Sequence, residues 1–139
     1  MNIRETIPAD LEAALALNNA NVPELNELDA PEIARLVSES VVSLTAEIDG
    51  RFAGFCILFA PAAPYQSLNY QWFSRNYDEF VYLDRIAVHP DFRRYGIGRA
   101  FYTDVIEWWK ASDASLRGRM FTSQHSTGNS PVKRSITSA

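Results

Sequence analysis

The sequence predicts one domain of mixed α and β structure (α/β in the broad sense, α+β in the narrow one), in which helices flank a β-sheet. Its 139 residues suit a single domain. With 47% hydrophobic and 22% charged residues, the composition is ordinary for a globular protein with a buried core. Along the chain, the spacing of apolar residues changes between the period of helices and the period of strands.

The N-terminal part is predicted to contain a short strand and two helices. Residues 2–6 have the composition of a strand. Pro8 suits the first turn of a helix, because its φ angle is already helical. Asp29 is placed to cap a second helix, and Glu32, three residues later, completes a capping box.

The middle of the chain is predicted to hold a β-hairpin and a further strand. Residues 42–48 alternate between apolar and polar, which is typical of a half-buried strand. Asp49-Gly50 indicates a two-residue turn, and a returning strand follows it. A connection rich in aromatic residues comes next, with a short helix expected over residues 67–76. A fourth strand is predicted for about residues 79–88.

A basic turn that contains glycine joins this strand to a helix predicted to end near residue 110. The turn reads Arg93-Arg94-Tyr95-Gly96-Ile97-Gly98-Arg99. A helix N-terminus leaves four backbone N–H groups without intrahelical acceptors and carries about half a positive charge, so it can hold a phosphate or diphosphate. Gly96 and Gly98 remove side chains where a diphosphate must approach the backbone. The three arginines add positive charge, and the residues alone therefore predict a diphosphate site.

This segment resembles the coenzyme A signature of the GNAT N-acetyltransferases, R/Q-x-x-G-x-G/A. The preceding Ile86-Ala87-Val88-His89-Pro90 resembles the end of that family's fourth strand, and the order of elements over about residues 1–111 is similar too. The resemblance implies a GNAT-like acyl-CoA N-acyltransferase fold on a mixed, mostly antiparallel sheet. It also implies an acyltransferase that moves an acetyl group from acetyl-CoA to a primary amine by direct attack, without a metal.

The resemblance further implies which residues hold the co-substrate. The backbone of the fourth strand would bind the pantetheine arm, and one of its N–H groups would polarise the thioester carbonyl. The N–H groups of the turn would bind the diphosphate. The predicted coenzyme A site comprises Ile86, Ala87, Val88, Arg93, Arg94, Tyr95, Gly96, Ile97, Gly98 and Arg99.

Other interpretations of the glycine turn fit less well. A Walker A loop needs G-x-x-x-x-G-K-[ST], which is absent, and a dinucleotide-binding fingerprint needs glycine where this chain has Phe101. The remaining alternative is an ordinary strand-to-helix turn with solvated arginines.

Asp84 is the predicted catalytic residue. Acetyl transfer needs a neutral amine, and a carboxylate near the fourth strand can accept the proton that the ammonium must lose. Period-two alternation places Tyr82, Asp84, Ile86 and Val88 on one face of the strand. The alternative is that Asp84 pairs with an arginine such as Arg85 or Arg75 and only shapes the cleft.

The aromatic connection also has two interpretations. Its rings, from Tyr65 to Tyr77, either form a wall for the amine, with cation–π contacts, or pack on the sheet. Cys56 is the only cysteine and lies in an apolar run, so we expect it in the core. One cysteine excludes an intrachain disulfide and a zinc site built on several cysteines.

Residues 112–139 are predicted to be an atypical Ser/Thr-rich basic tail. They hold four Lys or Arg and one acid, whereas residues 1–111 hold nine against sixteen. Their few large apolar residues follow neither period, so we expect no fifth strand beside residues 82–88 and a truncated or altered member of the family. No tyrosine follows Tyr102, so the tyrosine that protonates the leaving thiolate in relatives is missing. An exposed edge on the fourth strand would favour a homodimer.

Charge and hydropathy limit the expected partners. The net charge of -4 and pI of about 5.1 argue against nucleic acid. No leader pattern is present, and no apolar stretch approaches the roughly 20 residues of a membrane span. We therefore expect a cytoplasmic N-acetyltransferase that acts on a small-molecule or peptide amine, away from membranes. The alternative is a non-catalytic or degenerate acyl-CoA-binding module of the same family.

Overall fold

The computed structural model describes residues 1–112, 116, 118–122 and 135–137. Its strands are β1 (Asn2–Glu5), β2 (Val42–Ile48), β3 (Arg51–Phe59), β4 (Val81–Val88), β5 (Arg119–Thr122) and β6 (Ser135–Thr137). Its helices are α1 (Leu11–Ala20), α2 (Ala30–Glu39), α3 (Leu68–Asn76) and α4 (Ile97–Lys110), with 3-10 turns η1 (Pro8–Asp10) and η2 (Pro90–Tyr95). None of these helices, within the described residues, is long and apolar enough to cross a membrane.

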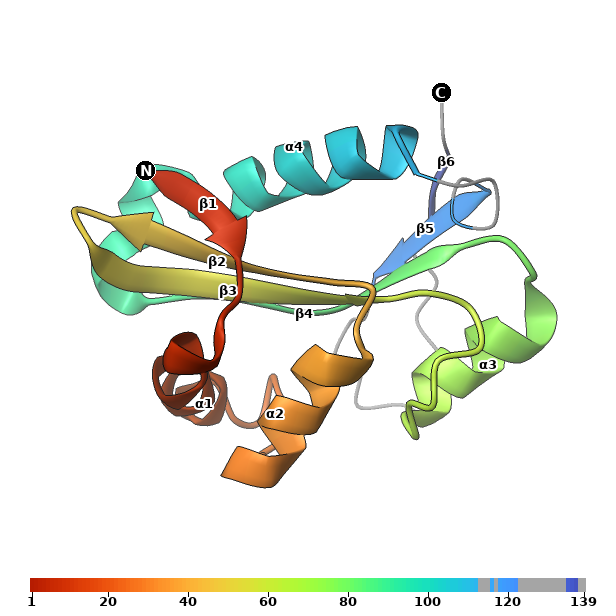
Figure 1. Cartoon of the computed structure of the whole chain (residues 1–139), viewed down its shortest axis with the longest axis horizontal. Helices are drawn as coiled ribbons and strands as arrows, with labels where there is room; N and C mark the ends of the chain where they lie inside the picture. Colours follow the sequence, from red (N-terminus) through yellow and green to blue (C-terminus); the bar gives the residue numbers. More distant parts are fainter. Residues whose placement is uncertain (113–115, 117, 123–134, 138–139) are drawn as a thin grey trace.

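Within the described residues, the six strands form one sheet in the order β1–β2–β3–β4–β5–β6. Neighbouring strands pair antiparallel, except that β4 and β5 are parallel. Figure 1 shows α1, α2 and α3 on one face of the sheet and α4 on the other. A mixed, mostly antiparallel sheet flanked by helices confirms the predicted fold class.

Local signals in the sequence explain where several elements begin and turn. The Glu32 N–H donates to Asp29 Oδ1 at 2.8 Å, and the Asp29 N–H donates to Glu32 Oε1 at 3.0 Å, so the predicted capping box starts α2. Asp49 and Gly50 have φ angles of 51° and 75°, as a two-residue hairpin turn requires. Ser67 caps α3, the short helix expected in the aromatic connection.

The sheet separates two cores. The core under α1, α2 and α3 includes Ile33, Phe55, Tyr70 and Phe73, whereas Cys56 and Phe101 belong to the core under α4. Cys56 is fully buried, as expected, and burial raises the pKa of its thiol to about 12.

β4 carries a bulge at Asp84. Arg85 pairs with Ile57 and Leu83 pairs with Leu58, so Asp84 has no partner residue on β3. A bulge of this kind bends the strand and redirects the side chain of the extra residue. The bulge is therefore the feature that places Asp84 beside a cavity.

The bulge also changes which residues of β4 share a face of the sheet. Tyr82 packs in the core of α1–α3, whereas Leu83, Ile86 and Val88 pack on the α4 side. The prediction that Tyr82, Asp84, Ile86 and Val88 share one face is wrong, because the extra residue breaks the period of two.

β5 is a strand that the sequence analysis did not expect. Met120 pairs with Val81 and Thr122 pairs with Leu83, so residues of the predicted tail lie parallel to β4. The prediction that no fifth strand forms beside β4 is therefore wrong. The greater part of the tail, including residues 123–134 and 138–139, lies outside the described residues.

The physical reason for the missed strand is that β5 is short and buried on both faces. Met120 and Phe121 are both at most 1% exposed, and a strand covered on both faces shows no alternation of polar and apolar residues. Gly118 lets the chain approach β4 closely, since a Cβ there would lie 2.4 Å from the carbonyl oxygen of Glu79.

Candidate functional site

Among the described residues, only the start of β4 pairs with β5, along the edge that faces away from β3. β5 pairs with only the first three residues of β4 and ends at Thr122, beside Leu83 (Figure 1). The His89 N–H donates to the Ala53 carbonyl at 2.8 Å, towards β3. Because backbone N–H groups alternate in direction along a strand, those of Ile86 and Val88 point away from β3. Among the described residues, no strand pairs with this edge at Asp84–Val88.

A cavity of about 650 Å³ extends from this edge to the start of α4. Its lining comprises Ile86, Ala87, Val88, Arg93, Arg94, Gly96, Ile97, Gly98 and Arg99, together with Asn21. Nine of the ten residues predicted for coenzyme A thus meet around one cavity. Tyr95 is the exception; its ring packs edge-on against Phe92, and the residue is 56% exposed.

The start of α4 presents backbone donors to this cavity. Gly96 joins η2 to α4 with a φ of 71°, which glycine adopts without strain. The Ala100 N–H donates to the Gly96 carbonyl at 3.0 Å, so the N–H groups of Ile97, Gly98 and Arg99 have no acceptor within the helix. No side chain among the described residues caps this helix. A Cβ on Gly98 would meet no protein atom within 4 Å, which leaves its backbone approachable from the cavity.

The three arginines of the turn face solvent. Arg93, Arg94 and Arg99 are exposed, and none of them forms an ion pair with a residue that the structure describes. Their positive charges add to the partial charge of the helix N-terminus. His89 takes part in the structure of the turn, because its Nδ1 accepts from the Asp91 N–H at 3.1 Å.

A second cavity, of about 130 Å³, lies beside β4 where β5 ends, and is called the fork cavity below. Its lining comes from β4, from the end of β5, from α4 and from the α1–α2 connection. The residues are Leu83, Asp84 and Ile86 of β4, Thr122 of β5, Tyr102 of α4, and Asn21, Glu24 and Leu25 of the connection. Asn21 and Ile86 also line the larger cavity, so the two lie end to end along β4.

Asp84 is almost enclosed at the edge of this fork cavity. The Tyr65 hydroxyl lies 2.9 Å from each carboxylate oxygen, and Arg85 Nε donates to Oδ2 at 3.0 Å. The ion pair with Arg85 that the sequence left open is thus present, whereas Arg75 Nε donates to the Gln71 carbonyl. Burial, and next the negative charge of Asp84, raise the pKa of Tyr65 well above its ordinary value.

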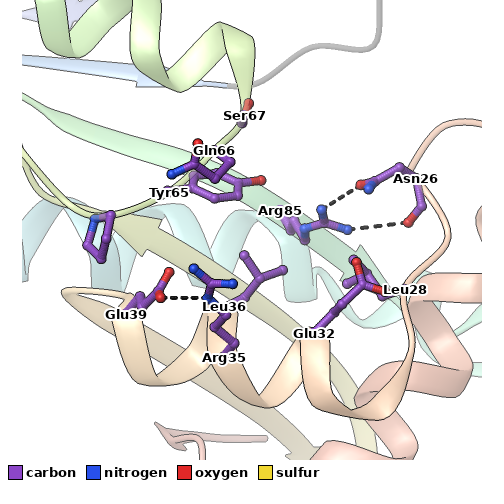
Figure 2. Close-up of a pocket in the computed structure, with 11 residues that line it drawn as sticks. Asn26, Leu28, Glu32, Arg35, Leu36, Glu39, Tyr65, Gln66, Ser67 and Arg85 are labelled. Atoms are coloured by element: carbon purple, nitrogen blue, oxygen red, sulfur yellow. Dashed lines mark hydrogen bonds and ion pairs between the residues drawn. The ribbon is translucent and has the colours of Figure 1, made fainter.

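A third cavity, of about 400 Å³, lies between α2 and the connection from β3 to α3 (Figure 2). Tyr65 and Arg85 line it, and on α2 an ion pair joins Arg35 to Glu39 at 2.8 Å. Tyr65 stacks on Phe59 with ring centroids 4.3 Å apart. Most rings of the aromatic connection pack on the sheet, which was the second of the two interpretations from the sequence. Tyr65 packs there and also lines the third cavity.

Comparison with known proteins identifies the family. A model of the Acetyltransferase (GNAT) family matches residues 11–128. The chain belongs to the GNAT acetyltransferase family. The match confirms the resemblance seen in the sequence, and it extends past residue 111 through β5. A search of curated proteins gave no match.

Solved GNAT structures share the fold of this chain. A ribosomal-protein-alanine N-acetyltransferase from Brucella melitensis has a TM-score of 0.68 at 22% identity, over 93% of this chain and 76% of that one. Ard1 from Thermoplasma volcanium has a TM-score of 0.65 at 18% identity, over 87% and 69%. NAA60 from Arabidopsis thaliana has a TM-score of 0.64 at 18% identity, over 87% and 74%.

Several residues around the GNAT cavities were not predicted from the sequence. Tyr102 follows the buried Phe101 on α4, so helical periodicity would place it on the flank of the buried stripe. Thr122 belongs to the missed strand, and Asn21 and Glu24 lie in a connection without periodicity. Among the described residues, no group of His, Cys, Asp and Glu is arranged to hold a metal ion.

Proposed function

We propose that this GNAT domain transfers an acetyl group from acetyl-CoA to a primary amine. The observation that carries the proposal is the 650 Å³ cavity, which joins an open strand edge to a basic helix N-terminus. The strand edge offers N–H groups to the amides of a pantetheine arm, and the turn offers N–H groups and positive charge to a diphosphate. The similar NAA60 structure is a complex with acetyl-CoA, which supports the same donor here.

The fork cavity is the proposed place of reaction. There the N–H of Ile86, which lines both cavities, donates to the thioester oxygen and stabilises the negative charge that develops on it. The amine nitrogen attacks the carbonyl carbon, a C–N bond forms, and the C–S bond breaks. The electron pair of that bond leaves on the sulfur of coenzyme A.

Asp84 is the proposed acceptor of the proton that the ammonium loses. The carboxylate borders the fork cavity, within reach of an amine that enters between β4 and the α1–α2 connection. Arg85 and Tyr65 both donate to it, and hydrogen bonds to the charged form favour that form. In this proposal the carboxylate of Asp84 accepts the proton directly or through a water molecule and then passes it to solvent.

The same contacts favour a second candidate, an acyl-CoA-binding module without catalysis. Both carboxylate oxygens of Asp84 already accept hydrogen bonds, from Tyr65 and from Arg85. In this alternative the network around Asp84 only shapes the cleft.

An acetyl-transfer assay distinguishes the two functions. The protein is incubated with acetyl-CoA and a panel of primary amines, including amino acids, polyamines and peptide N-termini, and free thiol and acetylated product are measured. The transferase predicts equal amounts of thiol and product with at least one amine. Coenzyme A binding without transfer to any amine would support the module, and absence of binding would contradict both.

Asp84→Asn tests the residue assigned to proton transfer. We expect coenzyme A affinity to change less than twofold, while turnover falls at least about a hundredfold, within the range of about 10²–10⁴ typical of general bases. The loss is greatest at low pH, where most of the amine is protonated. Asp104→Asn, an exposed residue of α4 that lines none of the three cavities, is the matched control. A pH–rate profile in Asp84→Asn equal to that of the wild type would remove Asp84 from the mechanism.

A further inference from the structure

The connection between α1 and α2, residues 21–29, borders all three cavities. Asn21 lines the large cavity and the fork cavity, and Leu25 lines the fork cavity. Asn26 and Leu28 line the third cavity. Because one segment forms a wall of each, its position sets the space available to ligands on both sides of Asp84.

Asparagine side chains at the end of α1 form hydrogen bonds with the backbone of this connection. Asn18 Nδ2 donates to the Asn26 carbonyl at 2.9 Å. Asn19 Nδ2 donates to the Leu28 carbonyl at 2.9 Å, and its Oδ1 accepts from the Leu28 N–H at 3.0 Å. Asn18 is fully buried, so water competes little for its side-chain bond to Asn26.

Arg85 joins the connection to the bulge of β4. Its Nη1 donates to Asn18 Oδ1 at 2.8 Å, and its Nη2 donates to Asn26 Oδ1 at 2.5 Å. Figure 2 shows the guanidinium directed at Asn26 across the edge of the third cavity. Its Nε donates to Asp84, and the side chain is 5% exposed. One planar group thus ties the end of α1 and the α1–α2 connection to β4, which lies about sixty residues away in the sequence, and a lysine ammonium lacks the planar fork for this.

We propose that Arg85 is a positioning residue that fixes the α1–α2 connection over the fork cavity and thereby sets the affinity for the acceptor amine. This role rests on the proposed acetyl transfer. Glu24 and Leu25 of the connection line the fork cavity together with Asp84, the proposed proton acceptor. The amine must enter between them and β4. A connection released from Arg85 leaves the thioester site intact and loosens the amine site.

Substitutions of Asn26 test the proposal without removing a buried charge. Asn26→Ala deletes the Oδ1 acceptor at an exposed residue and leaves the bonds of Arg85 to Asp84 and Asn18. We expect the KM for the amine to rise at least about fivefold, since misplaced binding groups weaken productive binding, with the KM for acetyl-CoA and kcat changed less than about twofold. Asn26→Asp restores an acceptor for Arg85 and is expected to restore the KM.

Asn76→Ala is the matched control. Asn76 is exposed, its Nδ2 donates to the Trp72 carbonyl at 2.7 Å, and it lines none of the three cavities. Its substitution is expected to leave every KM unchanged. An amine KM in Asn26→Ala equal to that of Asn76→Ala would overturn the proposal.

Hydrogen exchange of the free protein separates this proposal from the proposed function. In Asn26→Ala we expect the N–H groups of Leu25 and Leu28 to exchange at least about tenfold faster, because local opening becomes easier, while exchange in α4 is unchanged. If the wild type transfers no acetyl group, the proposed function fails, and faster exchange still supports the tie between Arg85 and the connection. Unchanged exchange would overturn that tie, whatever the activity.

Discussion

The turn before α4 and the network around Arg85 both place arginines beside β4, yet they differ in how those arginines are bonded. The three arginines of the turn are exposed and form no ion pair with any described residue. Arg85 is buried, and Asp84, Asn18 and Asn26 accept its hydrogen bonds. The turn therefore has positive charge and N–H groups available to bind an anion. In the network, by contrast, the hydrogen-bond donors of Arg85 are already bonded to neighbouring side chains.

The difference shows that arginines can have two roles beside the same strand. Those of the turn are available to bind a ligand, whereas Arg85 stabilises the packing around β4. An exposed arginine contributes little to stability, because water solvates its charge. A buried arginine contributes through its partners, because removing it leaves another charge unpaired in a poorly solvated place. Substitutions in the two regions should therefore affect different properties, affinity in one and stability in the other.

The largest expected effect comes from Arg85→Met. The substitution leaves the carboxylate of Asp84 without its cation, and breaking a buried ion pair costs about 3–5 kcal/mol of unfolding free energy. Arg94→Ala in the turn is expected to change the unfolding free energy by no more than about 0.5 kcal/mol. Urea denaturation of the two variants makes the comparison, with Arg85→Lys measured if Arg85→Met does not fold. Equal losses in Arg94→Ala and the Arg85 variant would remove the distinction between the regions.

A smaller effect, on affinity alone, is expected from Gly98→Val. The new side chain meets no protein atom near its Cβ and projects into the cavity, so it should lower coenzyme A affinity at least about tenfold, with a stability change below about 1 kcal/mol. Arg93→Ala should lower affinity less, because one arginine supplies part of a solvated cluster. Calorimetric affinities in the opposite order would show that side-chain charge, rather than close approach to the backbone, dominates binding.

The two regions also differ in how far the sequence predicts them. The turn is contiguous, so its glycines and arginines appear as a local motif beside a strand and a helix. The network joins Asn18, Asn26 and Tyr65 to the neighbours Asp84 and Arg85, and no local pattern connects the first three with β4. It also depends on the bulge at Asp84, which the residue types of β4 do not reveal.

The smallest expected effect concerns alkaline pH. Burial and the charge of Asp84 raise the pKa of Tyr65, so its hydroxyl stabilises the fold below the ordinary tyrosine pKa of about 10. As the pH rises above that value, the unfolded chain loses this proton first, and stability falls by up to about 1.4 kcal/mol per pH unit. Tyr65→Phe keeps the ring and removes this loss. Denaturation from pH 9 to 11 measures it, and identical slopes in both proteins would mean that Tyr65 ionises as readily when folded.

The central claim is that the edge of β4 and the turn before α4 bind coenzyme A, and thermal unfolding with added coenzyme A tests it most directly. A ligand that binds only the folded state stabilises it by about 1.4 kcal/mol for each tenfold increase above Kd. For a domain of this size, that corresponds to a rise in Tm of about 4 °C per tenfold increase. We predict this rise in the wild type and a much smaller one in Gly98→Val at the same concentrations. A wild-type Tm that stays constant up to millimolar coenzyme A would contradict the account.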